Sequence, residues 1–343
     1  MSLTKFARTI IVPTLLVLAC HPGFAQDVKK VGTSAAVFLR IPVGVRGAAM
    51  GSAYVALADD ASSMYWNAGG LARLDKVSVF VDHSPWLPGL DFNYFAFALP
   101  VRNVGTFGVN VTALTTAEME VTTIDNPMGT GERFSASSVA VAVAYSRNLT
   151  DRFSIGVNLK YIREAILNSA ATGFAFDIGT LYDTPFPRVR LGVSLSNFGT
   201  NLRIDGEDLN VRVDIAPEQA GNNQSVVGRL KTDPFTPPLI MRVGLSWDAI
   251  ASEQTRLTLA VDGTNPNDNA QSLNLGGEVA LFRETLLLWA GFNDLFLADR
   301  EKGLTLGAGI NLQTAGLEFF GGYAFQDFKR LGAVNRFSLG LKF

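Results

Sequence analysis

Cysteine and histidine are nearly absent from this 343-residue chain. Its one cysteine, Cys20, and one of its two histidines, His21, fall within residues 1–25, which have the features of a secretory signal. Cleavage after Ala25 leaves 318 residues (343 minus 25), no cysteine and one histidine, His83. This composition excludes disulfides, a thiol nucleophile and a Cys/His metal site in the mature chain. We therefore expect no metal and no cofactor.

The signal has three parts in the usual order. Lys5 and Arg8 supply the positive end, residues 10–19 form an apolar run, and residues 23–25 give a small-x-small cleavage site. The apolar run is too short to span a bilayer. Cys20 leaves a second processing route open, in which its thiol is acylated.

Long apolar runs and a strong charge of either sign are also missing. Without Lys5 and Arg8, 27 basic residues face 31 acidic ones, a formal charge of −4 that gives no reason to expect nucleic acid as a partner. No 18 consecutive apolar residues follow the signal, which excludes a helical membrane protein. Alternating residues can still form a lipid-facing band without such a run.

Alternation with a period of two residues is the strongest pattern from Asp75 onward. Phe107 and Val109, for example, alternate with Gly108 and Asn110. In most such segments the second face is rich in Gly, Ser, Ala and Asn, whereas a soluble sheet would present charged and bulky polar side chains to water. Glycine is also frequent, at 33 residues. The pattern predicts strands with one face toward lipid and the other toward a crowded lumen.

About fourteen strands are predicted, most of them near the roughly 9 to 11 residues that a tilted membrane strand needs. They lie at residues 75–82, 91–99, 104–115, 137–147, 152–163, 171–183, 188–197, 239–248, 254–262, 271–282, 285–293, 302–312, 315–326 and 334–343. Connections after even strands are short, and those after odd strands are longer, notably 116–136 and 198–238. This parity is typical of an outer-membrane β-barrel with both termini in the periplasm.

The chain ends with a possible assembly signal. The last strand places four apolar residues on one face and an aromatic residue at the terminus, which resembles the signal by which bacterial barrel proteins are recognised for assembly; these residues are Phe337, Leu339, Leu341 and Phe343. We therefore expect outer-membrane lipid and the barrel assembly machinery as partners. Several aromatic residues are candidates for interfacial girdles: Trp289, Phe292, Phe319, Tyr323 and Phe325.

The stretch from Phe38 to Leu74 differs from everything that follows. Between Val43 and Ala61 it has nine Ala or Gly residues and three charges, Arg46, Asp59 and Asp60. This composition suits backbone packed closely inside protein. The expected organisation is a signal peptide (1–25), an N-terminal plug (26–74) and a transmembrane β-barrel (75–343). An ordinary first strand and helix of a soluble domain is the alternative for the second part.

Five groups of residues in this stretch form a recognisable pattern: Phe38-Leu39, Pro42-Val43, Arg46-Gly47-Ala48-Ala49-Met50-Gly51, Ala58-Asp59-Asp60-Ala61 and Tyr65-Trp66-Asn67. In their order and spacing they resemble the FadL-like outer-membrane barrels, and among them the PorV/PorQ family. One departure is the sequence Asn67-Ala68-Gly69-Gly70, where the family usually has Asn-Pro-Ala-Gly. The remainder matches by architecture.

The resemblance implies one of two functions for a monomeric barrel in the bacterial outer membrane. PorV-like relatives serve the type IX secretion system, where they receive the C-terminal domain of a secreted protein and carry it to an attachment complex at the cell surface. FadL-like relatives bind hydrophobic molecules and release them along a path that the plug gates. We expect the first function, with other secretion components as further partners, and keep the second as the alternative.

Candidate site residues lie mainly in the plug. A transporter would need an apolar pocket, for which Met50, Tyr54, Met64, Tyr65 and Trp66 are the candidates, and Asn67 adjoins them. Asp59 and Asp60 can bind a cation or a head group. We expect them instead to pair with a base: Arg46, Arg190 or Arg242.

Other candidates lie outside the plug. His83 and Ser84 could serve a hydrolase, but no third member is evident, so we expect no enzyme. The acidic cluster Asp205, Glu207 and Asp208 lacks the spacing of a calcium loop, which favours a solvated loop. Three prolines in the same loop could rim a partner-binding surface: Pro234, Pro237 and Pro238.

Overall fold

The computed structural model describes residues 31–218, 225–297, 300–314 and 316–343. The predicted signal peptide and the first five residues of the predicted plug lie outside this part of the chain. Within it, no helix is both long and apolar enough to cross a membrane.

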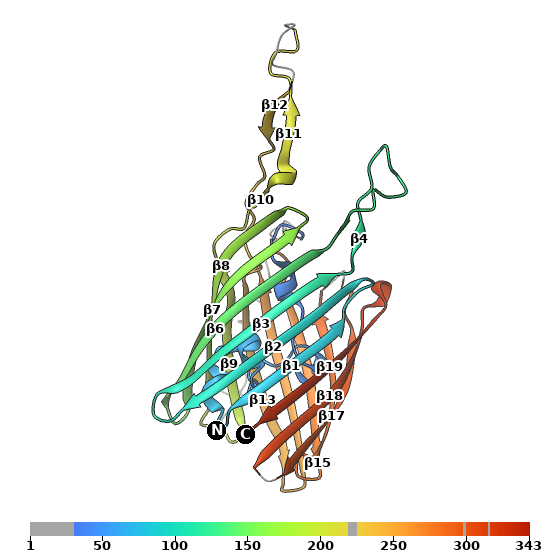
Figure 1. The fold of residues 1–343 in the computed structure, drawn as a ribbon. Coiled ribbons are helices and arrows are strands. Elements are labelled where there is room, and N and C mark those ends of the chain that lie inside the picture. Colours follow the sequence, from blue (N-terminus) through green and yellow to red (C-terminus); the bar gives the residue numbers. More distant parts are fainter. Residues whose placement is uncertain (1–30, 219–224, 298–299, 315) are drawn as a thin grey trace, which may run out of the picture.

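Fourteen long antiparallel strands form a closed barrel, which confirms the predicted fold class (Figure 1). Each predicted segment overlaps one of them. Pairing of β1 with β19 joins the two ends of the chain, and pairing of β8 with β9 completes the ring. The strands are β1 (Ser78–Pro85), β2 (Leu90–Val101), β3 (Gly105–Thr116), β6 (Ala136–Thr150), β7 (Phe153–Ile166), β8 (Ser169–Asp183), β9 (Val189–Gly199), β13 (Ile240–Ala251), β14 (Thr255–Pro266), β15 (Ser272–Leu281), β16 (Leu286–Leu295), β17 (Leu304–Thr314), β18 (Leu317–Asp327) and β19 (Ala333–Lys342).

The two faces of the wall follow the period-two pattern. In β3, Phe107 and Val109 are exposed on the outer face, whereas Asn110 is buried on the lumenal face. Among the girdle candidates, Phe319, Tyr323 and Phe325 point outward and Phe292 is half-buried. The prediction for Trp289 is wrong, because its ring is buried in the lumen, where its indole N–H donates to Glu278 at 2.7 Å.

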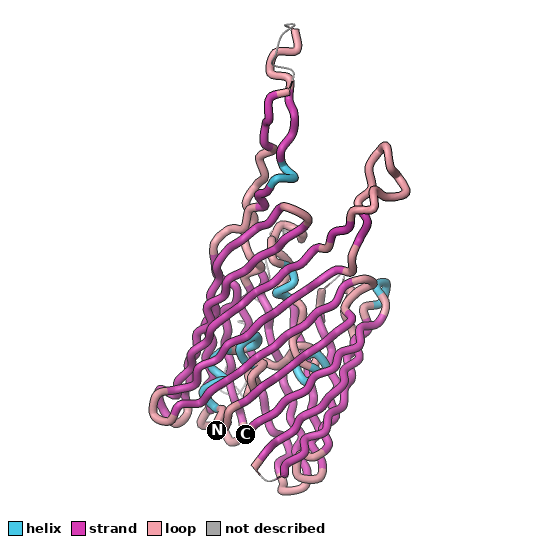
Figure 2. The backbone as a smooth tube through the Cα atoms, in the orientation of Figure 1, coloured by secondary structure: helices cyan, strands magenta, loops and turns pink. Residues whose placement is uncertain are grey.

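The two ends of the barrel differ (Figure 2). The end with short turns also holds the C-terminus, which identifies it as the periplasmic end. At the opposite, external end, the loop after β3 carries β4 (Met119–Glu120) and β5 (Arg133–Phe134). The loop after β9 carries β10 (Ile204–Gly206), η3 (Glu207–Leu209), β11 (Asn210–Val213) and β12 (Val226–Arg229), and the short helix η4 (Lys329–Leu331) precedes β19. The connection from β7 to β8 is tighter than predicted, because pairing continues to Ile166 and Ser169.

Residues 36–74, called the inner segment from here on, lie inside the barrel (Figure 1). Their elements are short: η1 (Val37–Arg40), α2 (Val45–Ala49), α3 (Ser63–Trp66) and η2 (Ala68–Arg73). Gly44 and Gly51 have positive φ angles at the two ends of α2, which helps to explain why that helix does not extend. The segment starts near the external end, where the Ala35 amide donates to the Thr236 carbonyl at 3.0 Å. It ends near the periplasmic end of the wall.

Glycine in the wall lets this segment pack directly against the strands. A Cβ added at Gly156 would overlap the carbonyl of Ala68, and one added at Gly291 would overlap the backbone of Gly51. No other residue type fits at such a close approach of two backbones. The lumenal glycines predicted from the pattern thus serve to fit the inner segment.

Candidate functional site

Arg46 of α2 is the centre of a buried ionic network. Its guanidinium lies 2.5 Å from Glu278 of β15 and 2.7 Å from Asp59, and it also donates to the Tyr54 hydroxyl at 3.1 Å. Glu278 is fully buried and has a second cation, Arg256, at 2.8 Å. The expected pairing of Asp59 with Arg46 is therefore present, while Glu278 could not be inferred as the main partner without the strand register.

Asp60 makes local contacts and forms no ion pair with a base among the described residues. One carboxylate oxygen accepts hydrogen bonds from the Ser62 amide, at 2.7 Å, and from the Ser62 hydroxyl. The two other bases named from the sequence have different partners. Arg190 pairs with Asp183 at 3.0 Å, and Arg242 stacks on the rings of Tyr65 and Trp66.

Two further carboxylates of the wall bind the backbone of the inner segment. Asp262 of β14 accepts the amides of Tyr54 and Val55 at 2.8 and 2.9 Å. Asp82 of β1 accepts the Gly44 amide at 3.1 Å and also pairs with Arg336 of β19 at 2.5 Å. Hydrogen bonds from N–H groups to a buried carboxylate are among the stronger ones in proteins. They fasten the inner segment to opposite parts of the wall.

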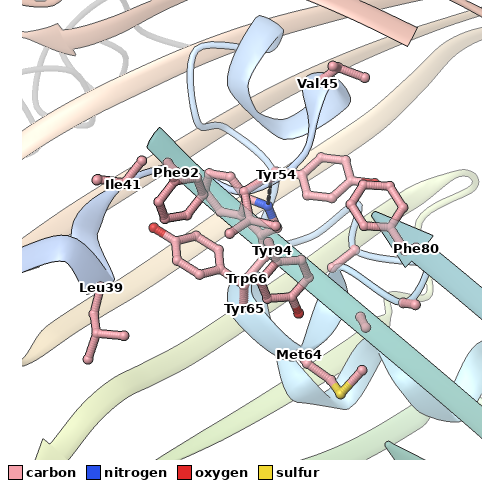
Figure 3. Close-up of a cluster of buried hydrophobic side chains, with 14 of the residues drawn as sticks. Leu39, Ile41, Val45, Tyr54, Met64, Tyr65, Trp66, Phe80, Phe92 and Tyr94 are labelled. Carbon is pink, nitrogen blue, oxygen red and sulfur yellow. Dashed lines mark hydrogen bonds between the residues drawn. The ribbon is translucent and has the colours of Figure 1, made fainter. Parts of the chain in front are cut away.

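The aromatic and methionine candidates form a packed core (Figure 3). Trp66 meets Tyr54 and Tyr65 edge to face, with ring centroids 5.7 and 5.0 Å apart. Met50 and Met64 are fully buried beside them. Asn67 donates to the carbonyls of Val55 and Thr180, both at 2.9 Å, and so joins the segment to β8. These side chains fill the space that an apolar ligand of a transporter would need.

Charged cavities lie on the periplasmic side of the inner segment. One, of about 220 Å³, is lined by Arg46, Asp60, Glu278 and Lys342 among others. A second, of about 400 Å³, is lined by Arg46, Asp59, Arg190 and Arg256 among others. The external side has a polar cavity of about 60 Å³ beside Tyr65 and Trp66. The inner segment separates these spaces, and their linings are polar or mixed. A further cavity of about 560 Å³ at the external end has a mostly apolar lining that includes Ile166, Leu202 and Phe235.

His83 and Ser84 point to opposite faces of β1. His83 is exposed on the outer face, where its Nδ1 lies 2.8 Å from the Asn93 side-chain oxygen. Ser84 is buried and donates to the Asn335 carbonyl at 3.1 Å. The two side chains therefore do not form a nucleophile and base pair. Among the described residues there is also no cluster of three or more potential metal-binding side chains.

Two external loops project beyond the barrel (Figure 1). The loop between β3 and β6 exposes Ile124 and Met128, which are 100% and 93% accessible. The hairpin of β11 and β12 exposes Ile215 and Val227 at 64% and 68%. These exposed apolar side chains lie on loops that extend past the wall, where another protein can reach them.

The acidic cluster at the base of this hairpin has a structural role. Asp208 accepts the Asn168 amide at 2.9 Å and the Ser169 hydroxyl at 2.8 Å. The hydrogen bond from Ser169 lowers the pKa of the Asp208 carboxyl below its usual value. Asp205 pairs with Arg229 of β12 at 2.9 Å. Pro237 and Pro238 are buried, so of the three prolines only Pro234 lies on an exposed surface.

Solved structures with a similar fold include two toluene transporters and a FadL homologue. The Pseudomonas putida toluene transporter TodX has 10% sequence identity and a TM-score of 0.55, over 88% of this chain and 97% of that one. The Ralstonia pickettii toluene transporter TbuX has 11% identity and a TM-score of 0.52, over 88% and 97%. A Pseudomonas aeruginosa FadL homologue has 14% identity and a TM-score of 0.50, over 87% and 96%. At such identities the likeness shows a shared fold.

Sequence comparison identifies the family. No curated protein matches significantly. The family model described as "Type IX secretion system protein PorV" matches residues 24–214, which is more than half of the chain and includes the inner segment. The closed fourteen-stranded barrel with short periplasmic turns agrees with this match. The chain belongs to the PorV family and is an outer-membrane β-barrel of the type IX secretion system.

Proposed function

We propose that this barrel receives the C-terminal domain of secreted cargo proteins on its external loops and holds it for transfer to other components at the cell surface. The proposal rests on a contrast between the lumen and the external loops. A segment bound to the wall occupies the lumen, whereas the two external loops project and expose apolar side chains. A protein partner has access to the loops.

The contacts of the inner segment favour the loops over the lumen as the binding surface. Asp82 and Asp262 bind its backbone from two sides, and the core around Trp66 leaves no passage for a polypeptide among the described residues. Moving this segment would take the amides of Tyr54 and Val55 from the buried Asp262 carboxylate, and the loss of each hydrogen bond to a charged group costs about 1.5–3 kcal/mol. A polypeptide path through this barrel is therefore costly.

Such a role requires no catalytic residue. Recognition by apolar loop tips depends on shape, burial and strand or side-chain contacts with the cargo domain. We accordingly propose that the protein is not an enzyme. Its expected partners are cargo domains and the secretion components that take them over.

A shortened hairpin tests the proposal. Asn210 and Arg229 are directly opposed in the β11–β12 register, so a two-residue turn can replace residues 211–228 without disturbing the strands below. The matched control is Phe186→Ser, which changes an exposed residue in a periplasmic turn. Each tagged barrel is purified from outer membranes in mild detergent, and its co-purifying proteins and lipids are identified by mass spectrometry.

We expect secreted proteins that share one C-terminal domain to co-purify with the wild type and with Phe186→Ser, and to be lost from the shortened variant. The same proteins on all three barrels would refute binding by the hairpin. An apolar compound without protein partners on the wild type would refute the secretion role in favour of transport.

A further inference from the structure

At its external mouth the lumen holds a small chamber that no part of the proposed function uses. Its volume is about 60 Å³, and it lies between the inner segment and the upper ends of β13 to β16. Its lining is polar, with Ser52, Asn274 and Asn293 among the side chains. A space of this size holds about two waters or one small ionic group, and it is too small for an acyl chain.

Three cations line the chamber: Arg40, Arg242 and Lys302. Arg40 is neutralised by Asp268, with its Nη1 at 3.0 Å from both carboxylate oxygens. Neither Arg242 nor Lys302 forms an ion pair with any residue that the structure describes. The chamber therefore has more positive charge than its own carboxylates balance.

Arg242 is the stronger indication, because it is 7% exposed. Its one hydrogen bond within the described chain runs from Nη1 to the Ser196 hydroxyl at 3.3 Å. The rings of Tyr65 and Trp66 lie 5.8 and 5.7 Å from its guanidinium carbon and hold the group in place. Asp262 is close enough to interact electrostatically with Arg242 but forms no ion pair with it, because its carboxylate accepts the amides of Tyr54 and Val55. A buried guanidinium keeps its charge, and burying that charge without a directly paired counter-ion is costly. A bound anion would remove this cost.

Lys302 faces the same space from the loop before β17. Burial lowers the pKa of its ammonium group; the negative charge of Asp294 opposes this, and the positive charges of Arg40 and Arg242 add to it. The carboxylate at this position, Asp294, is engaged by the Ser272 hydroxyl at 3.0 Å.

We propose that this chamber binds an oxyanion of the carboxylate or phosphate class, held by Arg242 and Lys302. The guanidinium supplies a planar, permanently charged donor set, and the ammonium group supplies a flexible one, a combination suited to oxygen anions. The site opens to the external side, so the ion enters from outside the cell. This inference does not depend on cargo binding, because none of the chamber residues lies on the projecting loops.

The test uses the full mature barrel in detergent. Its thermal midpoint is measured while inorganic phosphate, or acetate in a second arm, replaces chloride at constant ionic strength. We compare the wild type with Lys302→Gln, which lies outside the strands, and with Arg242→Gln. Arg102→Gln is the matched control, because Arg102 is an exposed arginine in a periplasmic turn.

We expect a saturable rise of the midpoint in the wild type and in Arg102→Gln, with at least one of the two anions. Half-saturation should require at least tenfold more anion in Lys302→Gln and Arg242→Gln. If Arg242→Gln fails to fold, Lys302→Gln alone decides. An equal effect of chloride, no effect of either anion, or an unchanged response in the variants would overturn the proposal.

Discussion

The buried pair of Asp82 and Arg336 offers a quantitative test of how the inner segment is held. Both side chains are fully inaccessible, and Arg336 has one carboxylate partner. Asp82 also accepts from Gly44 of the inner segment and from the Ser338 hydroxyl at 2.6 Å. Asp82→Asn leaves the Arg336 charge unbalanced and weakens the contact with Gly44.

The magnitude follows from these contacts. Removing one partner of a buried ion pair costs about 3–5 kcal/mol. The contact of Arg336 with the Phe92 ring, at 5.4 Å, is present in both proteins and cancels from the difference, whereas Asn keeps a side-chain oxygen that can accept a hydrogen bond, which places the expected cost at the lower end of this range. We therefore expect Asp82→Asn to lower the free energy of unfolding by roughly 3 kcal/mol. Urea unfolding in detergent or lipid vesicles, followed by tryptophan fluorescence, measures this difference.

Asp91→Asn is the matched control, because Asp91 is exposed at the external end of β2. The control should change the free energy of unfolding by less than about 0.5 kcal/mol. The double substitution Asp82→Leu with Arg336→Met removes both charges and should recover much of the loss. Equal free energies of unfolding for Asp82→Asn and Asp91→Asn would show that the buried pair does not hold the barrel together in this way.

Three other predictions concern the wall, its assembly and the external hairpin. Gly156→Ala should block packing of the inner segment and lower the yield of folded barrel, measured by heat-modifiable gel migration. Gly277→Ala is the control and should behave as wild type, because its added Cβ would have no neighbouring atom closer than 3.8 Å. Phe343→Ala should reduce the amount of barrel in the outer membrane, measured by fractionation and immunoblotting, and an unchanged amount would exclude Phe343 from the assembly signal. Because the pKa of the Asp208 carboxyl is lowered in the folded protein, the stability from its ionised form, which accepts the Asn168 amide, is fully present above about pH 4. This stability is lost as pH falls through the lowered pKa, so the Asn168 amide should exchange at the same rate in the wild type and in Asp208→Asn in strong acid. Slower exchange in the wild type at every pH would contradict this.

The barrel could be predicted from the sequence because its main signal is local. Strand alternation places Val109 outward and Asn110 inward without any knowledge of which strands pair. The glycine content of the inner face likewise indicates a filled lumen before any contact is known. Gly156 and Gly291 show that this reasoning was sound, since both accommodate backbone of the inner segment.

The partners across the lumen could not be predicted, because they depend on strand register and on closure of the ring. Glu278 and Asp262 are distant in sequence from Arg46 and Tyr54, and nothing local links them. The alternation does carry a usable signal: both carboxylates stand at inward positions, on strands whose inner faces are otherwise small or neutral except for Arg256 of β14. For Trp289, residue type alone predicts an outer girdle, whereas the face of the strand on which it lies points into the lumen.

Site-specific photocrosslinking in growing cells most directly tests the claim that cargo binds the loops while the lumen stays closed. A crosslinkable residue is placed at Val227 in the external hairpin and, in a second strain, at Asp60 beside the periplasmic cavity. The account predicts adducts with secreted proteins that share a C-terminal domain at Val227 and none at Asp60. Cargo adducts at Asp60, with none at Val227, would contradict it.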